Sequence, residues 1–415
     1  MKTRICVMTA GQLSTCPRLV KAADALTEAG YDVRVVSARF MDWATEGDRE
    51  LRRTRSWRWS VVDYHRATGR RTHLRSGARC RTARAGVRLL GAERAPLGLA
   101  ARAFGRVHPE LVRAALAEPA DLFYGGTTGG LAAAAAAGRR AGVPYALDLE
   151  DFFAGEHPDD RPDGRRANAL AARIERAVLP GAAFLTAGSA AIAAAYRERY
   201  GVSAIPIHNT FPLPALPPAL APSPGPGLRL YWFGQTLGPG RGIEDAVRAM
   251  AQARIPGEIR LRGVPAGGIL EYLGELAAGA PDLRIVPLEP AAPDRMVELC
   301  AGHDAGLAAE QAQPLNRNLC LTNKALTYIL AGMPIAASAT PGQTPLARDL
   351  GEGAFLYPPG DVTALARGLQ LWAGDRERLG RARAAAWEAA RRRWHWEHPL
   401  ERGALLGAVE RTVAA

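Results

Sequence analysis

The sequence predicts an α/β fold made of two facing, doubly wound (Rossmann-like) domains with a cleft between them. Short runs rich in β-branched residues alternate with longer helical patterns along most of the chain, which is typical of parallel sheets with crossover helices. A proline-dense segment at 211–227 interrupts this alternation once and is typical of a stiff linker. At 415 residues, the chain is also too long for one ordinary core and favours two or three domains.

The first half of the chain opens on a βαβ unit, whose helix has Pro17 in its first turn and Gly30 at its C-terminal stop. The segment 40–107 is ambiguous, and we expect one strand with mobile helices around it. Strands are expected at 4–9, 32–37, 60–64, 122–124, 145–149, 183–186 and 204–207. Helices are expected at 17–29, 168–178 and 190–200, among others.

The second half repeats the alternation after the linker. Strands are expected at 228–233, 258–261, 283–287, 305–308, 334–337 and 354–356. Helices are expected at 242–253, 268–278, 293–301, 323–331, 361–373, 376–393 and 399–413. The predicted organisation is an N-terminal domain at 1–212, a linker at 213–227, a C-terminal domain at 228–385 and final helices at 386–415.

Basic residues are unevenly distributed. Residues 49–113 contain 17 arginines and four acidic residues, a balance of +13 in a chain whose net charge is +12. This segment is either a solvated arginine-rich face or a contact for an anionic membrane or a phosphate-bearing acceptor. Trp57, Trp59 and Tyr64 interleave with the arginines, but no nucleic-acid motif frames them, so we expect no nucleic-acid partner.

The five cysteines are scattered and form no CxxC or Cys/His cluster. We therefore expect reduced thiols, a cytoplasmic protein and no structural zinc. No apolar run reaches the roughly 18 residues of a membrane-spanning helix, and the apolar run near the N-terminus is too short for a signal peptide. Peripheral attachment to the inner face of a membrane through 49–113 stays open.

Loops that follow strands carry the candidate sites, because ligands of open parallel sheets bind beyond the carboxyl ends of the strands. The loop after the first strand holds Gly11, Gln12 and Ser14, and Arg18 lies early in the next helix. The corresponding loop of the second half is 234–242. Neither loop fits the GxGxxG nicotinamide fingerprint, and the chain has no GxxxxGK[ST] phosphate loop.

Lys324 is exceptional in this arginine-rich chain. Only three of the 53 basic residues are lysine, and Lys324 is the one in the second half. Lysine is a compact point charge on a thin stem, whereas arginine is a wide planar fork. A site that places one ammonium against a phosphate can distinguish the two, although a surface lysine at a helix start is the alternative interpretation.

The second half resembles the donor domain of retaining glycosyltransferases of the GT-B fold, close to family 4. One segment that shows the resemblance is 231–244, YWFGQTLGPGRGIE, in which a strand is followed by a glycine and then by a basic residue before a second glycine. The other is 323–335, NKALTYILAGMPI, similar to the family's N-K-x-x-E-Y-x-x-x-G-x-P-V. The helix and strand at 17–33, the acidic strand end at 145–151 and Asn209 also fit. The resemblance implies that the final helices pack back toward the first domain.

The resemblance implies metal-independent, retaining transfer of a hexose from a nucleoside-diphosphate sugar, with no cofactor. Positive groups and helix N-termini would replace a metal at the diphosphate. It implies catalytic roles for Arg241, Lys324 and Glu310. It implies donor contacts from Gly234, Gln235, Gly240, Asn316, Thr322, Asn323 and Thr327. The acceptor side of the cleft would hold Gly11, Gln12, Ser14, Arg18, Asp148, Glu150 and Asp151.

Three positions depart from the family pattern. The second glutamate of the donor helix is Thr327, the arginine after the strand glycine is Gln235, and the histidine at the first-domain strand end is Glu150. Donor identity therefore stays open. The basic segment favours an anionic acceptor, such as a lipid-linked polysaccharide or glycolipid precursor. The alternatives are a natural-product glycosyltransferase, a GT-B sugar-nucleotide epimerase and an inactive glycosyltransferase-like scaffold.

Overall fold

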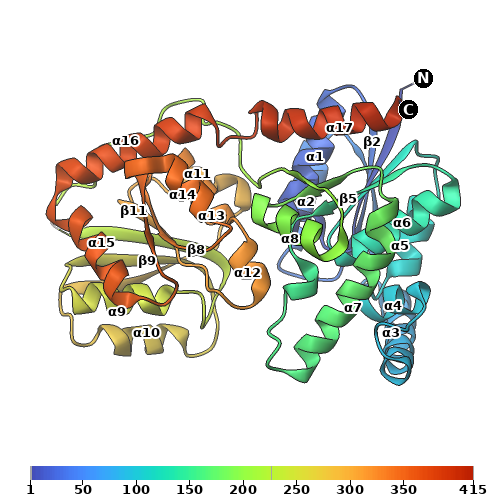
Figure 1. The fold of residues 1–415 in the computed structure, drawn as a ribbon, viewed down its shortest axis with the longest axis horizontal. Helices are drawn as coiled ribbons and strands as arrows, with labels where there is room; N and C mark the ends of the chain where they lie inside the picture. The colour runs from blue at the N-terminus through green and yellow to red at the C-terminus, as the bar shows by residue number, and fades with distance from the viewer. Residues whose placement is uncertain (1, 226, 415) are drawn as a thin grey trace. The chain divides into compact units, whose positions relative to one another are not determined.

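The computed structural model describes residues 2–225 and 227–414, which form two compact units (Figure 1). Unit 1 consists of Met1–His208, Pro314–Asn316 and Pro399–Ala415, and unit 2 consists of Asn209–Gln313 and Arg317–His398. Met1, Pro226 and Ala415 fall within the predicted domain ranges but lie outside the described residues.

Unit 1 is built on a seven-stranded parallel sheet in the order β3-β2-β1-β4-β5-β6-β7. Its strands are β1 (Arg4–Thr9), β2 (Asp32–Arg39), β3 (Arg58–Asp63), β4 (Leu122–Gly126), β5 (Tyr145–Leu149), β6 (Leu185–Ala187) and β7 (Ile205–Pro206). Its helices are α1 (Pro17–Glu28), α2 (Thr45–Thr54), α3 (Arg70–Leu90), α4 (Leu97–Phe104), α5 (His108–Ala115), α6 (Thr128–Ala141), α7 (Pro162–Val178), α8 (Ala190–Tyr200) and α17 (Ala404–Val413). Figure 1 shows helices flanking these strands.

Unit 2 is built on a six-stranded parallel sheet in the order β10-β9-β8-β11-β12-β13. Its strands are β8 (Leu228–Leu237), β9 (Gly257–Pro265), β10 (Leu283–Leu288), β11 (Ala305–Ala308), β12 (Ile335–Ser338) and β13 (Ala354–Tyr357). Its helices are α9 (Ile243–Gln252), α10 (Ile269–Ala277), α11 (Met296–Leu299), α13 (Asn323–Leu330), α14 (Thr344–Leu350), α15 (Val362–Gly374) and α16 (Arg376–Arg392), while α12 (Leu315–Leu319) contributes residues to both units.

Local sequence explains why these elements begin and end where they do. β5 is buried along its whole length, as expected for an internal strand of a parallel sheet covered on both faces. The Ser189 hydroxyl oxygen caps α8 by accepting a hydrogen bond from the Ile192 amide at 3.0 Å. Gly201 ends the same helix in the left-handed conformation, with φ +67°, which glycine adopts without a side-chain penalty.

The strand order reverses between β1 and β4 in one sheet and between β8 and β11 in the other. At such a switch point the loops leave neighbouring strands in opposite directions, which opens a crevice at the carboxyl edge of the sheet. In unit 2 the loops concerned follow β8 and β11. The topology therefore directs attention to residues 238–242 and 309–314.

The predicted pair of doubly wound α/β domains is confirmed, with differences in detail. β8 continues to Leu237 through an irregularity between Phe233 and Thr236, so part of the predicted loop at 234–242 is strand. The segment 40–107 contains α2, α3 and α4 around β3. Within the predicted terminal range 386–415, the end of α16 belongs to unit 2, and unit 1 takes only the residues from Pro399 onward.

The proline-dense linker is held against unit 2 by Arg383. This buried guanidinium donates to the carbonyl oxygens of Ala219 at 2.9 Å and Leu220 at 3.1 Å. It also donates to the carbonyls of His303 and Asp304, at 2.7 and 3.0 Å, just before β11. The conformation of the segment is thus restricted by the hydrogen bonds from Arg383 as well as by its prolines.

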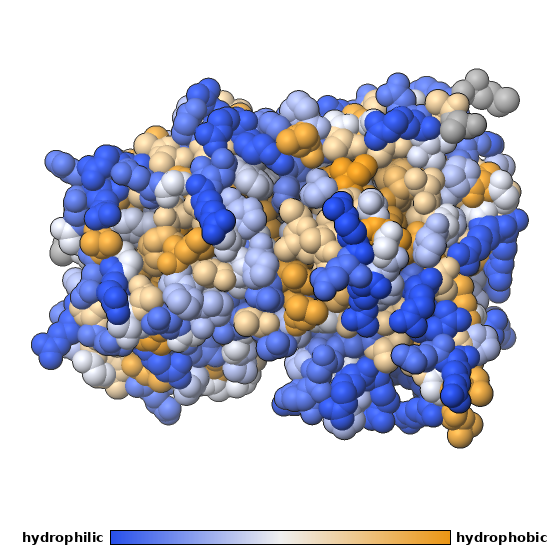
Figure 2. Space-filling view, in the orientation of Figure 1, coloured by the Kyte–Doolittle hydropathy of each residue, from blue (hydrophilic) through white to orange (hydrophobic). Residues whose placement is uncertain are grey.

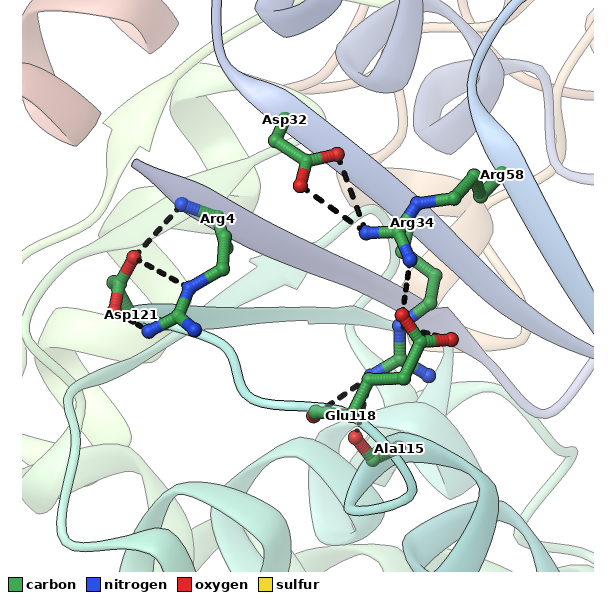
Figure 3. A network of polar contacts seen from close by, with 7 residues as sticks. All are labelled: Arg4, Asp32, Arg34, Arg58, Ala115, Glu118 and Asp121. Carbon is green, nitrogen blue, oxygen red and sulfur yellow. Dashed lines mark hydrogen bonds and ion pairs between the residues drawn. The ribbon is translucent and has the colours of Figure 1, made fainter. Parts of the chain in front are cut away.

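Arginines at the amino edge of the first sheet pair with carboxylates, as Figure 3 shows. Arg4 binds Asp121 at 2.7 Å, and Arg58 contacts both Asp32 and Glu118. Arg34 is buried and donates to the Ala115 carbonyl at 2.6 Å. This network lies at the edge opposite the carboxyl ends of the strands, and it uses Arg58 of the basic segment for the fold.

The helices of the described residues include none long and apolar enough to cross a membrane.

Gly306 positions α13 on the sheet of unit 2. A Cβ at this residue would overlap the ring of the fully buried Tyr328. We expect Gly306→Ala to destabilise the protein by about 1–3 kcal/mol through overpacking. Gly274→Ala, at an exposed helical glycine with open space around it, should stabilise by about 0.5–1 kcal/mol. Urea unfolding of both variants measures the difference, and equal effects would contradict this account.

Candidate functional site

An ion pair lies at the centre of the candidate site in unit 2. Lys324, in the first turn of α13, donates through Nζ to Glu310 Oε1 at 3.0 Å. Its second partner is the hydroxyl of Thr322, at 3.1 Å. Glu310 is the second residue after β11, so the pair lies at the switch point of the sheet. The side chains of Lys324 and Glu310 are 15% and 14% exposed, which leaves each of them accessible to a ligand.

Three cations act on Glu310. Burial alone would raise the pKa of this carboxyl group, but Lys324, Arg317 and Arg241 together lower it below its ordinary value. Burial and then Arg241 lower the pKa of Arg317, because two positive charges lie near each other. Three cations thus act on one carboxylate, and cations gathered in this way can bind an anionic ligand.

Two side chains, from the end of β12 and the residue before α14, hold the loop after β11 in place. Ser338 donates its hydroxyl to the Glu310 carbonyl at 2.6 Å. Gln343 is fully buried and donates through Nε2 to the Ala308 carbonyl and to the Ser338 hydroxyl, both at 2.9 Å. These bonds hold the backbone of Glu310 in place, so its side chain reaches Lys324 from a rigid support.

The loop after β8 packs closely on the end of β11. Gly242 has φ +73°, and a Cβ there would overlap Ala309, so this position needs glycine. Gly240 donates its amide to Glu244 Oε1 at 2.8 Å and accepts from Arg317 at its carbonyl at 2.6 Å. Arg241, between the two glycines, is exposed, and the α9 N-terminus follows it.

The indole ring of Trp232 lies beside the ammonium group of Lys324. The ammonium nitrogen lies 5.3 Å from the centre of the indole ring, within the range of a cation–π interaction. A Cβ at Gly234 would overlap the same ring, so the strand passes the indole closely. Gln235 is exposed in β8, where it contributes no charge.

Two predicted donor residues lie elsewhere. Thr327 is fully buried, and its hydroxyl donates to the carbonyl of Asn323 at 2.8 Å, one helical turn earlier. Asn316 belongs to unit 1. There its Oδ1 accepts from the Phe152 amide at 2.7 Å, and its Nδ2 donates to Asp151 Oδ1 at 2.8 Å.

In unit 1, Arg18 and Asp148 form a buried bidentate ion pair. Arg18 donates through Nε and Nη2 to the two Asp148 carboxylate oxygens at 2.9 and 2.6 Å. The Thr186 hydroxyl donates to the same carboxylate at 2.6 Å, and Arg18 also donates to the Ile207 carbonyl at 2.5 Å. Burial alone would lower the pKa of Arg18, but Asp148 outweighs it and raises that pKa. The pair joins α1 to β5 and β6.

The first loop of unit 1 is also bonded internally. Gln12 is fully buried, and its Oε1 accepts from the amides of Phe40 and Met41 at 3.2 and 2.9 Å. Ser14 donates its hydroxyl to the Ala44 carbonyl at 3.0 Å. The Gly11 amide donates to the Thr9 hydroxyl at 3.0 Å. The loop is therefore held in one shape by the segment after β2.

Glu150 and Asp151 follow β5 and are half-buried. Burial, then the neighbouring Asp151 and Asp148, raise the pKa of Glu150 to about 8. Burial and then Arg18 lower the pKa of Lys21 to about 7. The protonated carboxyl group of Glu150, at the end of β5, thus interacts with the weakly basic amine of Lys21, in α1. Together the two groups can both donate to and accept from hydroxyl groups.

Sequence reasoning gave little weight to several residues of the unit 2 site. Arg317 was assigned no catalytic or donor-binding role, although its guanidinium donates to the Gly240 carbonyl and lowers the pKa of Glu310. Trp232, Ser338 and Gln343 were not singled out. Ser338 ends a strand next to the switch point, and this position was a usable signal.

Within residues 2–225 and 227–414, no group of three or more His, Cys, Asp or Glu side chains is arranged to hold a metal ion.

Removing one partner of the Arg18–Asp148 pair should be costly. Asp148→Ala leaves a buried guanidinium without its counterion, so we expect a loss of about 3–5 kcal/mol in the free energy of unfolding. The matched control is Asp163→Ala, which breaks an exposed pair with Arg166 and should change stability little. Urea unfolding measures both, and an Asp148→Ala variant as stable as the control would contradict the assignment.

Glu150 should make stability fall as pH rises. Its pKa is about 8 in the folded protein and about 4.3 in an unfolded chain, so between these values only the unfolded state releases the proton. Stability from this group is therefore present at low pH and lost as pH rises toward 8. Glu150→Gln should flatten this part of the profile of unfolding free energy against pH, and an unchanged profile would refute the prediction.

Comparison with known proteins gives a domain match and a fold. Residues 17–210 match the family described as glycosyl transferase 4-like domain. A search of curated proteins found no match to the sequence.

Solved structures match over the whole length. Anabaena HepE, determined in complex with UDP and glucose, has a TM-score of 0.66 and 17% identity, and the match covers 99% of each chain. Sucrose-phosphate synthase from Thermosynechococcus elongatus has a TM-score of 0.66 and 14% identity, covering 100% of this chain and 99% of the other. S. aureus TarM has a TM-score of 0.66 and 8% identity, covering both chains completely. The chain therefore has the GT-B fold of these structures, and its residues 17–210 match a glycosyl transferase 4-like domain.

Proposed function

We propose that this protein transfers a hexose from a nucleoside-diphosphate sugar to an acceptor, with retention of the anomeric configuration and without a metal. The observation that carries the proposal is the group formed by Lys324, Glu310, Arg317 and Arg241 at the switch point of unit 2. HepE, which shares the fold, was solved with UDP-glucose. A nucleotide sugar is thus the ligand class that both the site and the fold favour.

The cations would act on the leaving diphosphate. As the bond to the sugar breaks, negative charge grows on the diphosphate, and fixed positive groups stabilise it without reorganising. Lys324 would supply a compact charge supported by Glu310, Thr322 and Trp232. Arg317 would supply a second charge, which compensates for the uncharged Gln235. The α9 N-terminus beside Arg241 adds a partial positive charge.

Glu310 would contact sugar hydroxyls. Its lowered pKa keeps the carboxyl group ionised, so it would accept hydrogen bonds from hydroxyls rather than donate them. In the retaining mechanism that the family resemblance implies, the leaving diphosphate takes the proton of the acceptor. No side chain of the site then has to act as a general base.

The acceptor would bind unit 1, near Glu150 and Asp151. Arg18 and Asp148 would support this region rather than contact the acceptor, since they are buried and satisfy each other. The basic balance of 49–113 favours an anionic or lipid-linked acceptor, as in polysaccharide or glycolipid synthesis. The free cysteines support a cytoplasmic location.

Titration calorimetry with a set of nucleoside diphosphates tests the proposal. We expect one diphosphate to bind, and Lys324→Ala and Arg317→Ala each to weaken binding by about 1.5–3 kcal/mol, the value of a hydrogen bond to a charged group. Arg254→Ala removes an exposed charge of the same unit away from the site and serves as the matched control. Sugar transfer should also fall in Lys324→Ala and Arg317→Ala and should stay unchanged in Arg254→Ala.

Two outcomes would overturn parts of this proposal. If no nucleotide binds the wild-type protein, the scaffold alternative replaces the enzyme. If a nucleotide binds and the sugar nucleotide is converted without any acceptor, the epimerase alternative replaces transfer.

A further inference from the structure

Helix α3 combines many positive charges with exposed apolar side chains. Its 21 residues, RRTHLRSGARCRTARAGVRLL, include seven arginines and no acidic residue. Leu74, Leu89 and Leu90 are 61%, 87% and 49% exposed. Single exposed apolar residues are common on folded proteins, but here three leucines share one helix with seven arginines and no acidic residue. This helix is thus a surface of unit 1 that the fold itself leaves unexplained.

Only part of the arginine content serves the packing of α3. Arg79 binds Glu110 at 2.6 Å, and Arg84 donates to the Ala103 carbonyl at 3.0 Å. These two bonds attach the helix to α4 and α5. Among the described residues, no carboxylate pairs with Arg70, Arg71, Arg75 or Arg81. Their charges are therefore available to a partner outside the chain.

The helical period separates the buried and exposed sides of α3. Ser76, Cys80 and Ala83 are buried on one side. The opposite side is outlined by exposed residues at helical spacing, namely Arg71, Leu74, Arg75, Ala78, Thr82, Ala85 and Leu89. In Figure 2, the lower right of the molecule, where Figure 1 places α3, shows hydrophilic atoms with apolar atoms at their edge.

We propose that the outer face of α3, together with its C-terminal end, docks on a lipid bilayer that contains anionic headgroups, with Leu74, Leu89 and Leu90 entering the interface. A helix with arginines beside exposed leucines and no acidic residue has the composition of an interfacial helix. The arginines contact the headgroups, and the surface potential of anionic lipid attracts them. The inference goes beyond the proposed transfer reaction and holds whatever the donor is.

The leucines decide between a membrane and a soluble polyanion. A nucleic acid or a polysaccharide would neutralise the arginines but would leave the side chain of Leu89 in water. Single-stranded nucleic acid is usually bound with aromatic side chains that stack on bases, and α3 contains no Phe, Tyr or Trp. A bilayer can contact the arginines with its anionic headgroups and the leucines with its apolar interior. It is therefore the partner that matches both kinds of side chain on α3.

Vesicle sedimentation of the full chain tests the proposal. Wild-type protein should bind vesicles of phosphatidylcholine with phosphatidylglycerol, should not bind phosphatidylcholine alone, and should dissociate as salt rises. Arg71→Gln/Arg75→Gln/Arg81→Gln should weaken the partition coefficient about a hundredfold, at about fivefold per arginine. Leu89→Ser/Leu90→Ser should weaken it at least about tenfold, because apolar area is no longer buried.

Matched controls come from exposed residues of unit 2. Arg254→Gln/Arg367→Gln/Arg378→Gln removes the same charge as the arginine variant. Leu216→Ser/Leu371→Ser changes leucines that are 79% and 50% exposed. Both controls should bind vesicles as the wild type does. Thermal unfolding verifies that every variant is folded.

The outcomes separate docking from the other claims. Retention on heparin without binding to anionic vesicles would replace the membrane by a soluble polyanion. An unchanged partition coefficient for the leucine variant would overturn insertion, and equal losses in the unit 2 controls would overturn the assignment to α3. Nucleoside-diphosphate affinity should stay the same in all variants, so failure of docking leaves the proposed transfer reaction standing, and the reverse also holds.

Discussion

The contact between Lys324 and Glu310 depends on how closely α13 approaches β11. Gly306 allows this approach, since the ring of Tyr328 lies directly over it. Lys324 Nζ, in the first turn of α13, then lies 3.0 Å from Glu310 Oε1, in the loop after β11. The same loop is fixed by Ser338 and Gln343. Catalytic geometry in parallel sheets requires such support, because a displacement of about 1 Å at reacting groups costs orders of magnitude in rate.

Arginine serves as a structural residue in this chain. Arg18, Arg34 and Arg383 are buried, and each donates to at least one backbone carbonyl. The planar guanidinium carries five N–H donors, so one side chain can bind several acceptors from separate segments. The basic character of the sequence therefore reflects two uses of one residue type, support inside the fold and charge on the surface of α3.

Much of the fold follows from sequence because its signals are local. Runs such as 145–149 are buried on both faces and contain no glycine or proline, so their strands are evident. The end of β8 was missed because Gly234, Gln235 and Thr236 are typical of loops, while pairing with β9 extends the strand. Arg18 and Asp148 lie 130 positions apart, and no spacing rule reveals that they bind each other. The burial of Thr327 depends on packing that a helix motif does not encode.

The scarcity of lysine has a chemical consequence. Lys2, Lys21 and Lys324 carry the only side-chain amines of the chain. Acylating reagents attack the neutral amine, and the pKa of Lys21, lowered to about 7 by burial, supplies that form at neutral pH, whereas the ammonium of Lys324 is bonded to Glu310. With only three lysines, each labelled peptide identifies the lysine that reacted. Labelling of Lys21 then reports on the candidate region of unit 1, and labelling of Lys324 on that of unit 2.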